Sequence, residues 1–312
     1  MPSRVHASRS ATVLLLTLFL AGCAWQRTPM APPTAAPPRT PISTPTVTRF
    51  DAGPTASSTR HAQPSATPAP TPSSTQPTLA PSSQRAYSAT LHLMHRDGTP
   101  FSTEAAYLLY LPRGYGQERG RKWPLVLFLH GSEERGDDAE QVRRNGLPKV
   151  LDQGAELPAL VLSPQCPART RWWQSTPFLG ALLDLVESSY AVDSSRVYVT
   201  GWSMGAYGTW ALALDYPRRF AALAPIAGGG DFRDDSIPEN LCQLRDVPVW
   251  VFHGARDETI APSESENAVQ ALQACGGNVR FTLYPEAGHD GAWELAYTDA
   301  VFYQWMLQQA RR

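Results

Sequence analysis

A serine between two glycines stands at the junction of a strand-like run and a helix-like run near the middle of this 312-residue chain. The pentapeptide at residues 201–205 reads GWSMG; it follows the β-branched run 196–200 and precedes a helical pattern over 206–216. The two glycines let a strand and a helix approach closely, which holds Ser203 on a strained turn with its hydroxyl exposed. The pentapeptide alone also fits an ordinary loop serine, so the sequence around it is needed to distinguish a nucleophile from a loop residue.

The surrounding pattern alternates between strands and helices. Alternating apolar residues at 87–95 and 105–111 predict an antiparallel pair at the start of the domain. The strands expected after it lie at 125–130, 159–163, 197–200, 220–227, 247–253 and 279–284, and the helices at 177–190, 203–216, 263–274 and 293–309. This alternation is typical of an α/β domain with a mostly parallel sheet and helices on both faces.

A serine hydroxyl becomes a nucleophile at neutral pH only beside a base, which a carboxylate orients. Asp257 follows the expected strand 247–253, and His289 follows the expected strand 279–284. The carboxyl ends of parallel strands meet at one edge of a sheet, so these side chains are expected to meet Ser203 there. We predict Ser203 as the nucleophile, Asp257 as the orienting acid and His289 as the base, in the order known for one hydrolase architecture.

Other acids and histidines fit these roles less well. An acid placed after the strand 220–227 remains an alternative, and the candidates there are Asp231, Asp234 and Asp235. Asp290 is expected to be a solvated or loop-fixing carboxylate, because adjacency to His289 in sequence does not place it behind the ring. His130 and His253 each precede a glycine at a strand end, and we expect loop backbone to hold both rings.

An acyl-transfer site also needs two fixed N–H donors for the developing oxyanion. The residue after the nucleophile supplies one donor, here Met204, and the loop after an early strand supplies the other. That loop follows residues 125–129, and Ser132 is the candidate within it. A plain strand-to-helix turn is the alternative interpretation of the loop.

Five segments resemble a known family: FLHGS at 128–132, SPQCP at 163–167, GWSMG at 201–205, VFHG at 251–254 with Asp257, and GHD at 288–290. Together they resemble secreted α/β-hydrolases of the polyhydroxybutyrate depolymerase and feruloyl esterase-like group, which includes carboxylesterases and proteins labelled only as predicted peptidases. The resemblance covers about residues 106–307 and implies the α/β-hydrolase fold with an acyl-serine mechanism. Such proteins often read His-Gly-Ser-Gly-Glu, whereas this chain has Glu133 at the second glycine, which could reshape the acyl pocket or move the second donor.

The first quarter of the chain cannot build a core. Residues 11–21 form an apolar run of about 11 residues after two arginines, which suits a signal peptide and is too short to span a bilayer. The run ends in LAGC, which resembles a bacterial lipobox and predicts a signal peptide over 1–22 with lipidation of Cys23; a simple secretory signal is the alternative. Residues 23–83 are rich in Pro, Thr and Ser and predict a disordered tether. The catalytic domain is then 84–312, outside the cytoplasm and lipid-anchored at the cell surface or in the periplasm.

The net charge, the motifs and the cysteines of the chain limit which partners, cofactors and disulfides are expected. The formal net charge is −1 with no basic stripe, so nucleic acid is not expected. No phosphate-binding loop or zinc-type spacing occurs, so we expect no metal and no cofactor. Besides Cys23 the chain has three cysteines, which either include a disulfide between Cys242 and Cys275 with Cys166 left free, or are all reduced.

These features predict a serine hydrolase that cleaves carboxylic esters in a small molecule or a polymer. Four tryptophans are candidates for lining an aromatic or polymer-binding cleft, although ordinary packing also accounts for each of them: Trp172, Trp173, Trp202 and Trp293. Two alternatives stay open. One is a serine peptidase with the same three residues, and the other is a non-catalytic surface lipoprotein that binds polymer.

Overall fold

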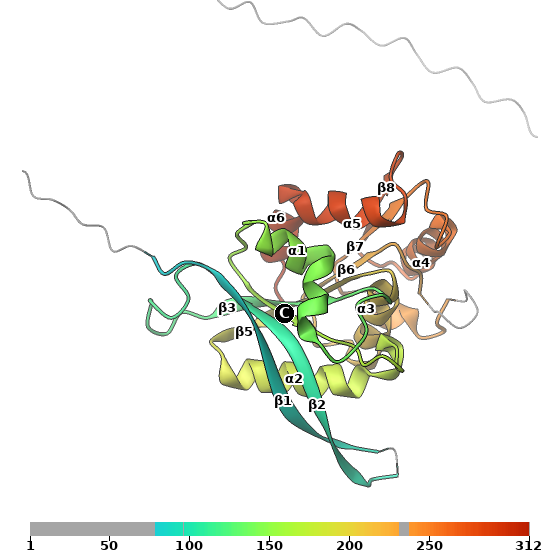
Figure 1. Cartoon of the computed structure of the whole chain (residues 1–312). Helices are drawn as coiled ribbons and strands as arrows, with labels where there is room; N and C mark the ends of the chain where they lie inside the picture. The colour runs from blue at the N-terminus through green and yellow to red at the C-terminus, as the bar shows by residue number, and fades with distance from the viewer. Residues whose placement is uncertain (1–78, 96, 231–236, 312) are drawn as a thin grey trace, which may run out of the picture. The chain divides into compact units, whose positions relative to one another are not determined.

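The computed structural model describes residues 79–95, 97–230 and 237–311 (Figure 1). One eight-stranded sheet runs through this part of the chain in the order β1-β2-β4-β3-β5-β6-β7-β8. Its strands are β1 Ser83–Met94, β2 Pro100–Leu111, β3 Trp123–Leu129, β4 Leu160–Pro164, β5 Val192–Trp202, β6 Ala222–Ile226, β7 Val249–Gly254 and β8 Val279–Tyr284. The pairs β1–β2 and β2–β4 are antiparallel, and every other pair is parallel, as the sequence predicts.

Helices cover both faces of the sheet. They are α1 Gly146–Asp152, α2 Thr176–Ser189, α3 Met204–Asp215, α4 Pro262–Ala274, α5 His289–Thr298 and α6 Ala300–Gln308. Strand β3 is buried along its whole length, and its alternate residues enter two separate cores. Leu127 packs with residues of α2, α3 and α4, whereas Phe128 packs with residues of α1, α5 and α6. Figure 1 shows α2 on one side of the sheet and α5 with α6 on the other.

The helix expected over 293–309 is wrong in its extent, because the structure has two helices in this region. Helix α5 begins at His289, and the chain breaks at Asp299 before α6. Asp299 is extended and its side chain accepts a hydrogen bond from the Val301 N–H, so it caps α6. An aspartate in this position stabilises a new helix start more than it favours a continuous helix. The short helix α1, with Pro148 inside it, was not expected.

A disulfide joins Cys242 to Cys275, near either end of the segment that carries β7 and α4. Cys242 lies in the 3₁₀ helix Leu241–Leu244, and Cys275 follows the last residue of α4. The remaining cysteine of the described chain, Cys166, is reduced and buried. This pairing corresponds to the first of the two cysteine arrangements considered above.

The signal peptide, Cys23 and most of the tether lie outside the described residues, so they remain predictions. Within residues 79–311, apart from the two gaps, no helix has the length and apolar character needed to cross a bilayer. The alternative acids Asp231, Asp234 and Asp235 also lie outside the described residues.

Candidate active site

Ser203 occupies a sharp turn between β5 and α3. Its backbone has φ 57° and ψ −120°, a conformation that costs a non-glycine residue free energy and that occurs mainly at functional sites. Glycine is required on the C-terminal side of the turn, because a Cβ on Gly205 would lie 1.8 Å from the Leu129 carbonyl oxygen. A Cβ on Gly201 would lie 2.3 Å from the Gly205 oxygen. The two glycines therefore let α3 begin directly against the ends of β3 and β5.

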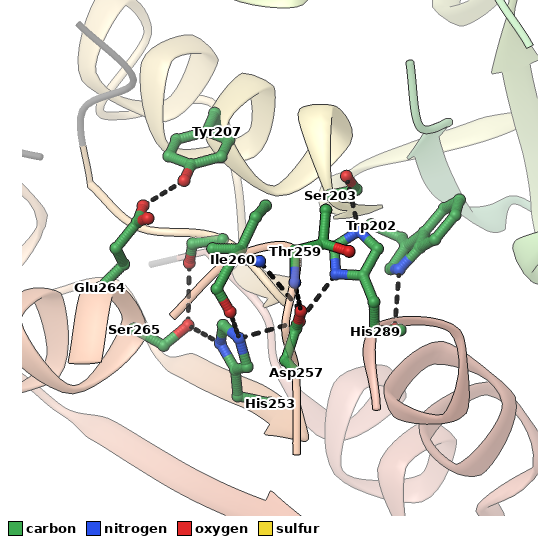
Figure 2. Close-up of polar contacts among 11 residues, drawn as sticks. Trp202, Ser203, Tyr207, His253, Asp257, Thr259, Ile260, Glu264, Ser265 and His289 are labelled. Atoms are coloured by element: carbon green, nitrogen blue, oxygen red, sulfur yellow. Dashed lines mark hydrogen bonds and ion pairs between the residues drawn. The ribbon is translucent and has the colours of Figure 1, made fainter. Parts of the chain in front are cut away.

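The structure brings the three predicted site residues together at the carboxyl ends of β5, β7 and β8 (Figure 2). His289 Nε2 lies 2.9 Å from Ser203 Oγ, and His289 Nδ1 lies 2.7 Å from Asp257 Oδ2. Since the Asp257 carboxylate can only accept, Nδ1 donates to it and Nε2 is left to accept the serine proton. The His289 side chain is 14% exposed, so the imidazole borders solvent while its carboxylate partner does not.

Asp257 is held as an ionised carboxylate. Its Oδ1 accepts hydrogen bonds from the N–H groups of Thr259 and Ile260, both at 2.9 Å. Burial by itself would raise the pKa of Asp257, but the hydrogen bonds from His253, His289 and the Ile260 N–H outweigh burial and lower this pKa below its usual range. The carboxylate is therefore charged at neutral pH, and as a hydrogen-bond acceptor it orients the His289 ring.

The loop after β3 packs against the turn that carries Ser203. The start of the loop is close to Trp202, since a Cβ on Gly131 would lie 2.6 Å from a ring carbon of that indole. His130 is fully buried; its Nδ1 donates to the Gly131 carbonyl at 2.6 Å, and its Nε2 accepts from the Cys166 N–H at 3.0 Å. Burial lowers the pKa of His130 to about 4, which agrees with a neutral ring held by loop backbone. Ser132 is exposed on this loop, and Met204 is the buried first residue of α3.

A buried carboxyl group in the same loop was missed by the sequence analysis. Glu133, which replaces the family's glycine, is exposed, but Glu134 is only 1% exposed and accepts a hydrogen bond from the Asn145 side chain. Burial raises the pKa of Glu134. Gln165 Nε2 also donates to the Glu134 carbonyl at 3.0 Å, which ties the loop to the end of β4. The final glutamate of the His-Gly-Ser-Gly-Glu pattern was the signal that could have identified this residue.

The prediction that Trp172 lines a substrate cleft is wrong, because this side chain is 0% exposed. Its indole donates to the His130 carbonyl at 2.9 Å and packs on the His130 imidazole. Trp202 and Trp293 are also buried, and their rings pack edge to face at 6.1 Å. Trp202 Nε1 donates to the His289 carbonyl at 3.2 Å, so this indole fixes the backbone of the predicted base. Trp173 alone of the four is partly exposed, and it packs against Tyr207.

Asp290 is exposed in the first turn of α5, as expected for a solvated carboxylate. No group of three or more histidine, cysteine, aspartate or glutamate side chains in the described parts of the chain is arranged to hold a metal ion.

The chain is similar to several known proteins. Residues 170–296 match the model of the Dienelactone hydrolase family, a range that includes Ser203, Asp257 and His289. A solved structure entitled "Crystal Structure of a Thermostable Esterase" superposes with a TM-score of 0.55 at 28% identity, over 72% of each chain. The chain has the α/β-hydrolase fold.

Two relatives of this α/β-hydrolase are named as a depolymerase and as a carboxylesterase. Over an aligned length of 115 residues the chain is 50% identical to "Poly(3-hydroxyalkanoate) depolymerase C" of Paucimonas lemoignei, and the match covers 28% of this chain and 27% of the depolymerase. A "Probable carboxylesterase SOBER1-like" of Arabidopsis thaliana is 24% identical over 71% of this chain and 84% of its own length. The chain therefore spans only about a quarter of the depolymerase, and its relation to that enzyme is local.

Proposed function

We propose that this protein is a serine hydrolase that cleaves carboxylic esters through an acyl-serine intermediate. The observation that carries the proposal is the continuous hydrogen-bonded path from Ser203 through His289 to Asp257. An α/β-hydrolase fold and relatives named as an esterase and a depolymerase support the same reaction class.

In the proposed reaction, Ser203 Oγ attacks the acyl carbonyl carbon while His289 Nε2 takes the hydroxyl proton. The N–H groups of Met204 and Ser132 are proposed to donate to the oxyanion that forms. The tetrahedral intermediate then breaks its bond to the alkoxy oxygen, and the His289 imidazolium protonates the departing alcohol. Water attacks the acyl-enzyme with His289 again as the base, which releases the acid and restores the serine.

The proposed substrates are esters of a small molecule or of a polymer. A relative named as a poly(3-hydroxyalkanoate) depolymerase supports a polymer substrate, and one named as a carboxylesterase supports small esters. Structural neighbours named as peptidases are 14–18% identical and show the fold alone, so a peptidase has no separate observation in its favour.

Activity of the full-length protein on a panel of esters tests the proposal. The panel holds short aryl esters, a feruloyl ester, an acetylated sugar and a 3-hydroxyalkanoate oligomer, and unstructured casein is the peptide control. We expect ester hydrolysis in the wild type and a loss of several orders of magnitude in Ser203→Ala. Full activity in Ser203→Ala, or cleavage of casein without cleavage of any ester, contradicts the proposal.

We also propose that the protein acts outside the cytoplasm on a lipid anchor at Cys23. The lipobox-like sequence LAGC and the tether-like composition of residues 23–83 support this location. Expression in bacteria with an alkyne fatty acid is expected to label the wild type and to place it in the membrane fraction. An unlabelled wild type, or equal labelling of Cys23→Ser, contradicts the anchor.

A further inference from the structure

The Asp257 carboxylate contacts a second imidazole that the proposed reaction does not use. His253 Nε2 lies 3.1 Å from Asp257 Oδ2, the same oxygen that His289 contacts at 2.7 Å. Both the His253 and the Asp257 side chains are 0% exposed. Figure 2 shows the two imidazoles on different sides of the carboxylate, with His253 on the side away from Ser203.

The surroundings of His253 fix a proton on Nε2 and the orientation of the ring. Its Nε2 also lies 3.1 Å from the Ile260 carbonyl oxygen, so both neighbours of this nitrogen are acceptors and Nε2 must carry a proton. Its Nδ1 lies 2.7 Å from Ser265 Oγ, a hydroxyl that is also 2.9 Å from the Gly228 carbonyl. With a partner at each nitrogen and no exposed surface, the ring cannot turn without breaking hydrogen bonds in the interior.

We infer that His253 is a positioning residue, which holds the Asp257 carboxylate in the orientation that His289 requires. The inference rests on the proposed function. Asp257 lies in the loop that follows β7, and His289 is the partly exposed first residue of a helix, whereas His253 belongs to the buried strand β7 itself. The Thr259 and Ile260 N–H groups hold Oδ1, and the fixed His253 N–H on the strand holds Oδ2, the oxygen that His289 contacts. His253 therefore sets the direction of the oxygen that orients His289.

The same contacts connect the carboxylate to the turn that holds Ser203. Ser265, on α4, joins His253 to the Gly228 carbonyl. A Cβ on Gly228 would lie 3.2 Å from the Ser203 carbonyl oxygen, so this segment packs against the turn. His253 thus lies in a contact network that spans β7, α4 and the segment after β6, and it touches no group that reacts.

The alternative is that His253 is an ordinary buried histidine whose loss affects only folding. Two variants of the full-length protein separate these roles: His253→Gln keeps a side-chain N–H donor, and His253→Leu keeps similar bulk without one. The measurements are the rate at which a fluorophosphonate labels Ser203, kcat and KM on an aryl ester, and the melting temperature.

For His253→Leu we expect kcat and the labelling rate to fall by about 10²-fold, because a misplacement of order 1 Å in a catalytic group has an effect of this size. KM is expected to stay within about twofold, since no substrate contact is lost. His253→Gln is expected to retain most of the activity that His253→Leu loses. Equal activity in His253→Leu and the wild type overturns the inference, as does an equal loss in the two variants.

A double-variant cycle makes the test specific. If His253 acts through Asp257, then His253→Leu should cause no further loss of kcat in an Asp257→Ala background. Full additivity of the two losses overturns the inference, because a purely structural role does not depend on Asp257.

If His253→Leu does not fold, Ser265→Ala takes its place, since it removes the Nδ1 partner and leaves the ring present. A drop of about threefold to tenfold in kcat is then expected, at the scale of one lost neutral hydrogen bond. An unchanged kcat in Ser265→Ala overturns the inference. Failure of the proposed function is recognised separately, because the wild type itself would then not be labelled at Ser203.

Discussion

The turn that carries Ser203 depends on the absence of a side chain at Gly205. In Gly205→Ala the new Cβ would lie 1.8 Å from the Leu129 carbonyl oxygen and 3.0 Å from the His130 oxygen, and non-bonded Cβ contacts under 3.0 Å essentially do not occur. Both opposing atoms are backbone, so no flexible side chain can move aside. The start of α3 and the end of β3 must therefore separate by more than about 1 Å, on the scale that reduces catalysis by about 10²-fold.

We expect Gly205→Ala to lower the rate of fluorophosphonate labelling of Ser203 by at least about 10²-fold. Overpacking of a close contact also destabilises a protein by about 1–3 kcal/mol, so the free energy of unfolding in urea should fall by that amount or more. Labelling kinetics and urea unfolding on the same preparation provide both values.

Gly291→Ala is the matched control. Gly291 lies inside α5, and its Cβ would meet only the Ala287 Cβ, at 3.1 Å. Alanine is favoured over glycine in a helix by up to about 1 kcal/mol, and the tight contact with Ala287 opposes this gain. The variant should therefore keep its unfolding free energy within about 1 kcal/mol of the wild type and should be labelled at a similar rate. Wild-type labelling and stability in Gly205→Ala would refute the packing argument for the turn.

Three further predictions concern stability and pH. The pKa of Asp257 is lowered in the folded state, so its contribution to stability is complete above the unfolded pKa of about 3.9 and is lost as the pH falls below that value. The difference in unfolding free energy between wild type and Asp257→Asn should therefore be smaller at pH 3 than at pH 6. An equal difference at the two pH values would contradict the lowered pKa. The folded pKa of His130 is about 4, below its unfolded value of about 6.5, so stability should fall as the pH drops from about 6.5 to about 4, and His130→Gln should show a shallower fall in urea titrations. The Cys242–Cys275 disulfide closes a separation of 33 residues, and its reduction should destabilise the fold by about 3–4 kcal/mol, measured by urea unfolding with and without reductant; no change in the midpoint would contradict the pairing.

The sequence predicts the three central residues because their positions depend on local rules. Each of Ser203, Asp257 and His289 follows an apolar strand, and the parallel sheet brings the ends of β5, β7 and β8 to one edge. Close backbone contacts exclude a side chain at Gly201 and Gly205, so the two glycines can be recognised in a short sequence motif.

Contacts made by packing were not predictable in this way. The sequence suggested a cleft role for Trp202, whereas its indole instead donates to the His289 carbonyl, a contact between residues 87 positions apart. His253 was expected to be held by loop backbone, which describes its contact with Ile260 but omits Asp257. Both contacts depend on how helices and loops pack against the sheet, and no periodic pattern in the sequence specifies that packing.

Trapping of the acyl-enzyme tests whether Ser203 is the nucleophile. The full-length protein is mixed with a slowly hydrolysed aryl ester, quenched in acid and digested, and the acylated peptide is sequenced by mass spectrometry. We expect one acyl group on Ser203, absent from Ser203→Ala, with a decay rate that equals the steady-state turnover if deacylation limits the reaction. Ester turnover by the wild type with the acyl group on another residue, or turnover that persists in Ser203→Ala, would show that Ser203 is not the nucleophile.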